Sequence, residues 1–299
     1  MKNKNLFLLH FTVLIWGFTG VLGELISVSA LHLVWYRVGI AALSLLLFFV
    51  VKRKNIHVPF RKLIRVFLVG GIVGLHWVLF FHGIKISTVS VVLVTLSSLT
   101  LFTSILEPLI NKKRISLADV GVGLLIIFGI YLIFKFETQY ALGIILGLSA
   151  ALCASIFSIL NAQMVKHTPP SIITFYEMLG AFFGVSIFML FTGQFDEQMR
   201  LNTSDLLYLL LLGTGCTAIA YVLGVAVMKE LSAFTVALVT NLEPVYGIIL
   251  ALLVFGRSET MSLGFYAGSV TVLAAVFIYP YLKTKIENRR RPLINRKLH

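Results

Sequence analysis

Charged side chains inside long apolar stretches are the residues of this sequence that could do chemistry. Glu243 lies near the middle of the apolar stretch 232–255, and Pro244 follows it directly. An ionised carboxylate inside lipid must be protonated, paired or exposed to a hydrated cavity. Pro244 removes one backbone donor and frees a carbonyl group. The two residues predict a site for a cationic group of a ligand or for a coupling proton. The alternative is a helix kink in which Glu243 bonds the freed backbone.

A second pair of charges, Arg37 and Glu177, lies in two other apolar stretches. Segments 35–37 and 175–177 match when the sequence is compared with itself, and each carries two aromatic residues before the charge. A buried guanidinium or carboxylate normally has a partner or a solvated cavity. Each residue is therefore a candidate gate residue that pairs in one state and is released in another. A static bond to a backbone carbonyl or a lipid headgroup is the alternative.

Polar-tipped aromatic side chains in the other stretches add candidate ligand contacts. His76 and Trp77 are neighbours, Tyr221 stands at the repeat-equivalent position of His76, and Trp16 lies in the first stretch. Such side chains combine a large apolar face with a hydrogen-bonding tip, as metabolite pockets require. Asn161 adds an amide that could bond a ligand or only a neighbouring helix. For His76, a core position with a bond to a backbone carbonyl is the alternative.

The composition indicates the solvent around these residues. Of the 299 residues, 59% are hydrophobic and 12% are charged, and the mean hydropathy is +0.97. These values lie outside the range of soluble globular domains. The two cysteines, Cys153 and Cys216, lie in apolar runs without the spacing of a metal site. We therefore expect a membrane protein with neither a disulfide nor a bound metal.

Ten apolar stretches account for most of the chain, and each is close to the roughly 20 residues that a membrane helix needs. They lie at 5–25, 31–51, 64–85, 87–110, 117–135, 140–163, 171–192, 205–228, 232–255 and 262–282. The first is longer than the apolar core of a signal peptide. With a cytoplasmic N-terminus, most of the 25 Lys and Arg residues fall in inside loops and in the basic tail 283–299. The positive-inside rule therefore predicts that both termini are cytoplasmic. It makes the tail a topology anchor, with a patch for anionic lipid or nucleic acid as the alternative.

An internal repeat divides the chain into two halves. Segment 92–95 matches segment 237–240, and Ser116-Leu117 with the glycines after it resembles Ser262-Leu263 with those that follow. These matches predict two five-helix repeats, residues 1–137 and 138–282. Because five is odd, the second repeat must be inverted in the membrane, as in secondary transporters with a substrate site between their halves. We expect an all-α integral membrane protein of ten transmembrane helices that works as a transporter.

Other functional classes fit the sequence less well. An intramembrane enzyme would need a nucleophile with a base or a metal motif, and neither HExxH nor nucleophile-elbow spacing occurs. A channel would show a hydrated polar stripe along one helix. A membrane scaffold would need no charge near the midplane. The sequence therefore favours a carrier and not an enzyme.

Several motifs are shared with a known family. They are Trp16-Gly17, Arg37, Leu242-Glu243-Pro244, and the stretch from Phe255-Gly256 to Gly264 and Gly268. On these residues the whole chain resembles the EamA-like family of the drug/metabolite transporter superfamily. It departs where similar proteins have an acidic residue after the equivalent of Gly256, because Arg257 stands there and Glu259 follows two residues on. It also has Ser98-Leu99 where the repeat would give Glu-Pro.

The resemblance implies gradient-driven export or uptake of amino acids, sugars, nucleobases or related metabolites, without an ATP site or a bound cofactor. It also implies a central site lined by spans 1, 3, 4, 6, 8 and 9, with spans 5 and 10 at the periphery. The mixed signs of Arg37, Glu177 and Glu243 suit a zwitterion, so amino acids are the first expected substrates. We expect the inner (cytoplasmic) membrane of the cell as the location, lipid and a small molecule as partners, no nucleic acid, and a monomer or homodimer.

Overall fold

The computed structural model describes residues 2–112, 117–275, 277–278 and 281, and these residues form helices and no strand. The α-helices are α1 (Lys2–Leu25), α2 (Ala30–Val51), α3 (Phe60–Ile86), α4 (Val89–Leu96), α5 (Leu99–Ile110), α6 (Leu117–Phe136), α7 (Ala141–Met164), α8 (Pro170–Thr192), α9 (Thr203–Leu211), α10 (Ala220–Val227), α11 (Ala233–Thr240) and α12 (Leu242–Phe255). A further apolar helix covers Leu263–Ala275. A π-helix, η3 (Leu212–Ile219), joins α9 to α10. Short 3-10 helices are η1 (Thr138–Tyr140), η2 (Glu197–Met199) and η4 (Gly256–Glu259).

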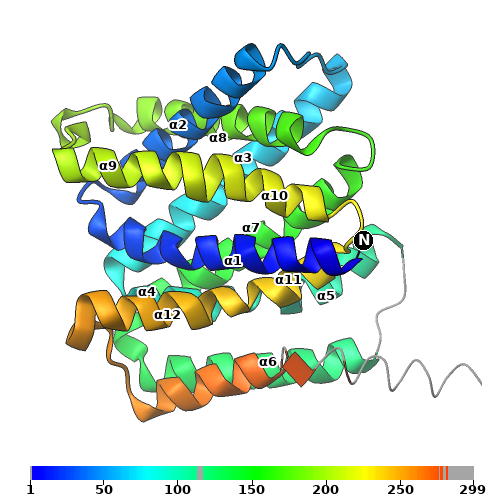
Figure 1. The fold of residues 1–299 in the computed structure, drawn as a ribbon. Helices are drawn as coiled ribbons and strands as arrows, with labels where there is room; N and C mark the ends of the chain where they lie inside the picture. The colour runs from blue at the N-terminus through cyan, green and yellow to red at the C-terminus, as the bar shows by residue number, and fades with distance from the viewer. Residues whose placement is uncertain (1, 113–116, 276, 279–280, 282–299) are drawn as a thin grey trace, which may run out of the picture.

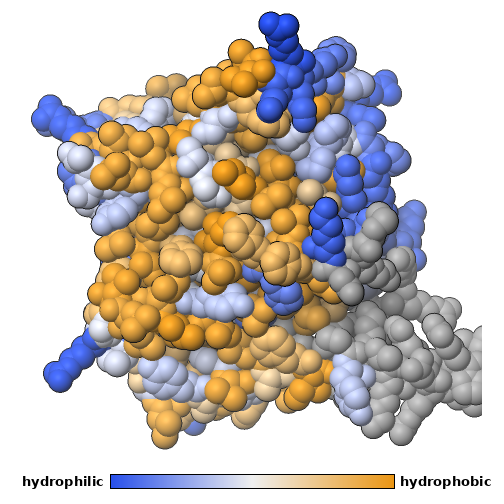
Figure 2. Space-filling model, in the orientation of Figure 1, coloured by the Kyte–Doolittle hydropathy of each residue, from blue (hydrophilic) through white to orange (hydrophobic). Residues whose placement is uncertain are grey.

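The length and apolar character of these segments make this a multi-pass membrane protein. Within the described residues, eight helical segments are long and apolar enough to cross a membrane, and Gly121–Phe136 and Leu263–Ala275 are shorter apolar helices. Large apolar side chains such as Phe191 and Leu263 are more than four-fifths exposed, as lipid contact requires. Figure 2 shows hydrophobic residues across the middle of one face and hydrophilic residues mainly toward its two lateral edges. The count of ten spans and the cytoplasmic termini stay predictions.

The helices lie roughly parallel and antiparallel to one another (Figure 1). We call the end of the bundle at which α1 begins the N side, and the opposite end the far side. The N side holds the start of α11 and the end of α5, and the far side holds the start of α4 and the end of α12. The sequence predicts that the N side is cytoplasmic.

The two halves make matching contacts. In the first half, α3 packs against α7 and α8 of the second; in the second half, α10 and η3 pack against α1 and α2 of the first. In the same way α12 packs on α1, while α4 and α5 pack on α7. These reciprocal contacts are what two repeats related by an approximate twofold axis produce.

Two of the predicted spans are each broken into two helices. Span 87–110 breaks between α4 and α5 at Ser97 and Ser98, and span 232–255 breaks between α11 and α12 at Asn241. Each break is a tightened turn, because Ser97 N bonds Val94 O and Asn241 N bonds Leu238 O three residues back. Pro244 explains the second break, since it has no N–H for the carbonyl of Thr240. The first break occurs without a proline nearby.

A carboxylate from each broken span holds the start of the other one. On the N side, Glu107 Oε2 near the end of α5 accepts a hydrogen bond of 2.9 Å from Phe234 N of α11. On the far side, the two carboxylate oxygens of Glu259, just after α12, accept bonds of 2.9 Å from Val89 N and Ser90 N of α4. The first N–H groups of a helix lack intrahelical partners, so a carboxylate there can accept their hydrogen bonds. Its negative charge also interacts favourably with the positive end of the helix dipole. The two broken spans are thus tied together at both ends.

The pair formed by α6 and the helix Leu263–Ala275 lies at one edge of the bundle (Figure 1). Its side chains form a separate apolar cluster that includes Ile126, Ile133, Phe265 and Val272. The two helices approach closely, because a Cβ on Gly129 would lie 2.9 Å from the carbonyl oxygen of Gly268. This pair corresponds to spans 5 and 10, and neither helix contributes to the central cavity.

Candidate functional site

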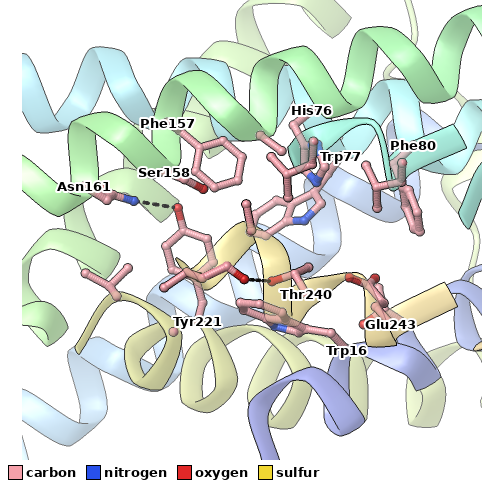
Figure 3. Close-up of a pocket in the computed structure, with 18 of the residues that line it drawn as sticks. Trp16, His76, Trp77, Phe80, Phe157, Ser158, Asn161, Tyr221, Thr240 and Glu243 are labelled. Carbon is pink, nitrogen blue, oxygen red and sulfur yellow. Dashed lines mark hydrogen bonds between the residues drawn. The ribbon is translucent and has the colours of Figure 1, made fainter. Parts of the chain in front are cut away.

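A cavity of about 90 Å³ lies between the two halves, several times the roughly 10 to 15 Å³ that one water occupies. Figure 3 shows residues from both halves converging on it. Its walls are mostly apolar and aromatic, with a small number of polar groups, as is usual for a small-molecule site. The lining residues are Trp16, Thr19, Arg37, His76, Trp77, Phe80, Leu96, Leu99, Ala154, Phe157, Ser158, Asn161, Tyr221, Gly224, Val225, Met228, Val236, Ala237, Thr240 and Glu243.

Seven of the nine residues predicted from the sequence line this cavity. They are Trp16, Arg37, His76, Trp77, Asn161, Tyr221 and Glu243. Pro244 instead borders a smaller cavity where the two helix breaks meet, beside Ser97 and Asn241. Glu177 lies outside the lining and contacts it through Asn161. The elements that line the cavity also include α2, through Arg37, beyond the spans that the family resemblance implied.

Some lining residues escaped the sequence reasoning. Thr19, Phe157, Ser158 and Thr240 all face the cavity. A hydroxyl can bond a carbonyl of its own helix, as Thr240 Oγ1 does with Val236 O at 2.9 Å. A small hydroxyl residue or a Phe in an apolar span therefore carries no signal that separates a cavity wall from ordinary packing.

Arg37 is fixed on one side and free on the other. Its Nε donates to Thr217 Oγ1 at 2.7 Å, and its Cζ lies 4.1 Å from the ring centroid of Trp77. The guanidinium thus has a cation–π contact and a neutral hydrogen-bond partner in a site where it is 2% exposed. Its buried Nη1 has no hydrogen-bond partner among the described residues. Arg37 therefore offers one unused charged donor at the cavity.

The partner of Arg37 belongs to the π-helix. Thr217 Oγ1 donates to Leu212 O, five residues back, at 2.6 Å, and the hydroxyl's remaining lone pairs accept from Arg37. A π turn inserts an extra residue into a helix, and such turns occur often at functional sites. The π-helix thus aims the Thr217 hydroxyl at the guanidinium.

Glu243 is the acidic group of the cavity. It is 7% exposed and stands in the first turn of α12, directly after the break at Asn241. Arg37 is the cation whose charge acts on it, but the two groups form no ion pair within 4.0 Å in the described part of the chain. A ligand with both charges could therefore interact with each of them.

The other polar cluster of the cavity joins three helices. Asn161 of α7 donates from Nδ2 to Tyr221 Oη of α10 at 3.1 Å and to Glu177 Oε2 of α8 at 3.4 Å. In Figure 3, Asn161 and Tyr221 lie at the opposite end of the view from Glu243. Glu177 is fully buried, so it has no contact with lipid headgroups, which removes one of the two static alternatives that the sequence left open.

His76 is held by a backbone carbonyl. Its Nδ1 lies 2.8 Å from Ala150 O, and because a carbonyl only accepts, Nδ1 carries the hydrogen. Its ring packs against Phe80 and Phe157, with centroids 6.2 and 5.4 Å away. This geometry matches the core-histidine alternative, although the ring still lines the cavity. Trp77 contacts Tyr221 edge to face at 5.9 Å and so connects the two ends of the site.

No group of three or more His, Cys, Asp or Glu side chains with metal-site geometry occurs in the described ranges. Cys153 and Cys216 are both free. The polar groups that line the cavity are the Arg37 guanidinium, the Glu243 carboxylate, the Asn161 amide, the His76 imidazole, and indole and hydroxyl groups.

Comparison with known proteins gives a family and a fold. Residues 3–135 and 141–279 each match the EamA-like transporter family. One solved crystal structure superposes with a TM-score of 0.68 at 14% sequence identity, over 94% of this chain and 99% of the other. At that identity the likeness describes the fold alone. No curated protein sequence matches the chain.

Proposed function

Since this chain belongs to the EamA-like transporter family, we propose that it is a secondary transporter that moves small polar metabolites across the inner membrane by alternating access. Amino acids are the first candidate substrates, and sugars or nucleobases are the alternative. The membrane fold and the family support transport as such. The substrate class and the mechanism are the new part of the proposal.

The observation that carries the proposal is the central cavity, which both halves build beside the two broken spans. Asn241 at one break donates to Thr100 Oγ1, just after the other break, at 2.5 Å. Interrupted helices beside a cavity leave backbone groups free for a ligand, as in other secondary transporters. Residues from α1, α2, α3 and α7 complete the walls.

The charges of the cavity favour a zwitterion. The unpartnered Nη1 of Arg37 suits a carboxylate, which a guanidinium binds through charge-assisted hydrogen bonds. Glu243 suits an ammonium group, and the aromatic faces of Trp16 and Trp77 suit an apolar side chain. A neutral sugar or nucleobase would use the hydroxyls and the amide but neither charge.

The reciprocal ties of Glu107 and Glu259 support alternating access. Each tie closes one end of the same two broken spans, and the helix starts that they hold, Val89 and Phe234, are equivalent in the repeat. Two similar closures at opposite ends suit a carrier that opens one end while the other stays shut. A channel would need both ends open together.

The test uses purified protein in liposomes and a panel of labelled amino acids, with and without an imposed pH gradient. We expect uptake by the wild type and a large loss in Glu243→Gln, which removes the charge and keeps the shape. Glu197→Gln is the matched control, because the Glu197 side chain is 86% exposed. Flux of sugars or nucleobases instead of amino acids would contradict the substrate class. Absence of flux for all three classes would contradict transport.

A further inference from the structure

Glu177 is a carboxylate in the membrane interior without a cation. It is fully buried, and within the described residues the ion pairs are Lys85 with Glu24 and Arg200 with Glu197. Burying an unpaired ionised carboxylate costs several kcal/mol or more. A carboxylate held in such a place therefore needs a positive partner that the chain itself does not provide there.

Three buried oxygen atoms around Glu177 have no hydrogen-bond partner among the described residues. They are Glu177 Oε1, Asn161 Oδ1 and Thr174 Oγ1. Asn161 contacts Glu177 directly at 3.4 Å, and Thr174 lies three residues earlier on α8, on the same helix face. Buried polar atoms in native proteins are almost always bonded. One carboxylate oxygen and two neutral oxygens beside it are therefore available as ligands for a cation.

The packing around Glu177 limits the size of that cation. A Cβ on Gly70 of α3 would lie 2.2 Å from Glu177 O, so the backbones of α3 and α8 are in direct contact there. Gly180 makes the same kind of approach to Phe67 O. The Glu177 side chain is also fully buried and lies outside the lining of the central cavity, so that cavity gives an organic ammonium group no access to it. A proton or a small metal ion is what the site can accommodate.

The groups that face Glu177 from its neighbouring helices bring no competing charge. α7 contributes the neutral Asn161 and α10 contributes Tyr221. The cation of α2, Arg37, is engaged with Thr217 and Trp77. On α3, His76 is bonded to Ala150 O. Among the described residues, none of these groups forms an ion pair with Glu177.

We propose that Glu177, Asn161 and Thr174 bind one small monovalent cation, a proton or Na⁺. Oxygen ligands including a single carboxylate suit a hard cation of one charge. Asn161 and Tyr221 belong both to this cluster and to the wall of the central cavity. Occupation of the cation site therefore changes the hydrogen bonds that the cavity offers. The role of this cation as the coupling ion rests on the transport function proposed above, whereas its binding does not.

The binding test needs no transported substrate. The unfolding temperature of the purified full-length protein is measured in detergent, first in NaCl against choline chloride and then across pH 5 to 8. A ligand that binds only the folded state raises that temperature with its concentration. We expect stabilisation by NaCl if the ion is Na⁺, or by acid without an effect of NaCl if it is a proton. Either response should be lost in Glu177→Gln and kept in Glu243→Gln.

Thr174→Val keeps the proposal testable if Glu177→Gln does not fold. It removes one ligand oxygen and keeps both the shape of the side chain and the Glu177 carboxylate. We expect it to need roughly five to ten times more Na⁺ for the same stabilisation, the loss of about one hydrogen-bond-sized contact. In the proton case its response to acid should stay close to that of the wild type. The proposal is overturned if the wild type responds to neither cation, if Glu177→Gln responds like the wild type, or if Glu243→Gln alone loses the response. Failure to transport any amino acid would affect only the proposed function.

Discussion

Arg37 and Glu177 stand at equivalent positions of the two repeats and have opposite chemistry. Arg37 carries its positive charge with it and has a hydroxyl and an indole ring as partners. Glu177 has a carboxylate and has neutral partners, the Asn161 amide at 3.4 Å and the Tyr221 hydroxyl. The scaffold needs the same helix packing in both halves, but it does not need the same charge. The first half therefore contributes a cation of its own, Arg37, whereas the second half has a carboxylate that we propose binds a cation from solution.

The helices that face these two residues differ as well. Arg37 meets the π-helix η3 within the unit formed by α9, η3 and α10. The corresponding unit of the first half, α3, is a regular α-helix from Phe60 to Ile86. It packs its glycines against α8 beside Glu177. Arg37 is therefore hydrogen-bonded to a residue of the π-helix, whereas Glu177 lies where the backbones of α3 and α8 are in close contact.

Removal of the positive charge of Arg37 should have the largest effect on transport. Arg37→Met keeps the length of the side chain and deletes the charge, so that Glu243 becomes the charged group of the cavity. We expect amino-acid transport to fall about 100-fold in kcat/KM, the loss of one or two charge-assisted hydrogen bonds. Uptake in liposomes measures it, with the largely exposed Arg200→Met as the control. Activity within twofold of the wild type would show that Arg37 is structural.

Loss of the hydroxyl that positions Arg37 should have a smaller effect. Thr217→Val removes the acceptor for Arg37 Nε and leaves the cation–π contact with Trp77 in place. We expect about a tenfold loss of transport, because one hydrogen bond to a charged group is worth ~1.5 to 3 kcal/mol and part of it is replaced. The loss should appear mainly in KM if Arg37 binds the substrate. An unchanged KM with a lower folding yield would instead indicate a packing role.

Removal of a hydroxyl beside Glu177 should change the affinity for the cation rather than the KM for the substrate. Tyr221→Phe removes the hydroxyl that accepts from Asn161 and also bonds Glu177, and it keeps the ring contact with Trp77. We expect roughly a fivefold change in the cation concentration that gives half of the thermal stabilisation, the size of one neutral hydrogen bond. A substrate KM that changes while the cation response stays constant would contradict this assignment.

A polar contact between α2 and α8 that lies outside both the central cavity and the Glu177 cluster should have the smallest effect on transport. Trp35 Nε1 of α2 donates to Ser186 Oγ of α8 at 2.9 Å. Ser186→Ala should lower the free energy of unfolding by about 1 kcal/mol and leave both transport and the cation response unchanged. Thermal unfolding and uptake measured on the same preparation check this. A change in the cation response would mean that α2–α8 packing alone controls the site.

The sequence allowed the buried charges to be predicted, because a charged residue in an apolar run stands out. Arg37, Glu177 and Glu243 were expected to lie in the membrane interior, and the structure buries all three. Their partners could not be predicted. The contact of Arg37 with Thr217 depends on which faces of α2 and η3 meet, and this information is spread over the whole packing.

Helix interruptions were predictable only where proline marks them. Pro244 indicated the break in span 232–255, whereas Ser97 and Ser98 look like ordinary small residues of a packed membrane helix. The π-helix left no signal either, because Gly213, Thr214 and Gly215 fit an α-helix equally well in lipid. The repeat alone related the two breaks, through the match of 92–95 with 237–240.

The π-helix has a consequence for the evolution of the site. One inserted residue offsets everything after it by about 100° around the helix axis. Deletion of a single residue within 212–219 would restore a regular helix and turn Tyr221 and Gly224 away from the cavity, while Asp205 would keep its bonds to Ser27 on the far side. The π-helix therefore sets which face of α10 points to the cavity, independently of the face that α9 presents. A change of one codon in length could exchange the cavity wall of this span without altering the anchored end.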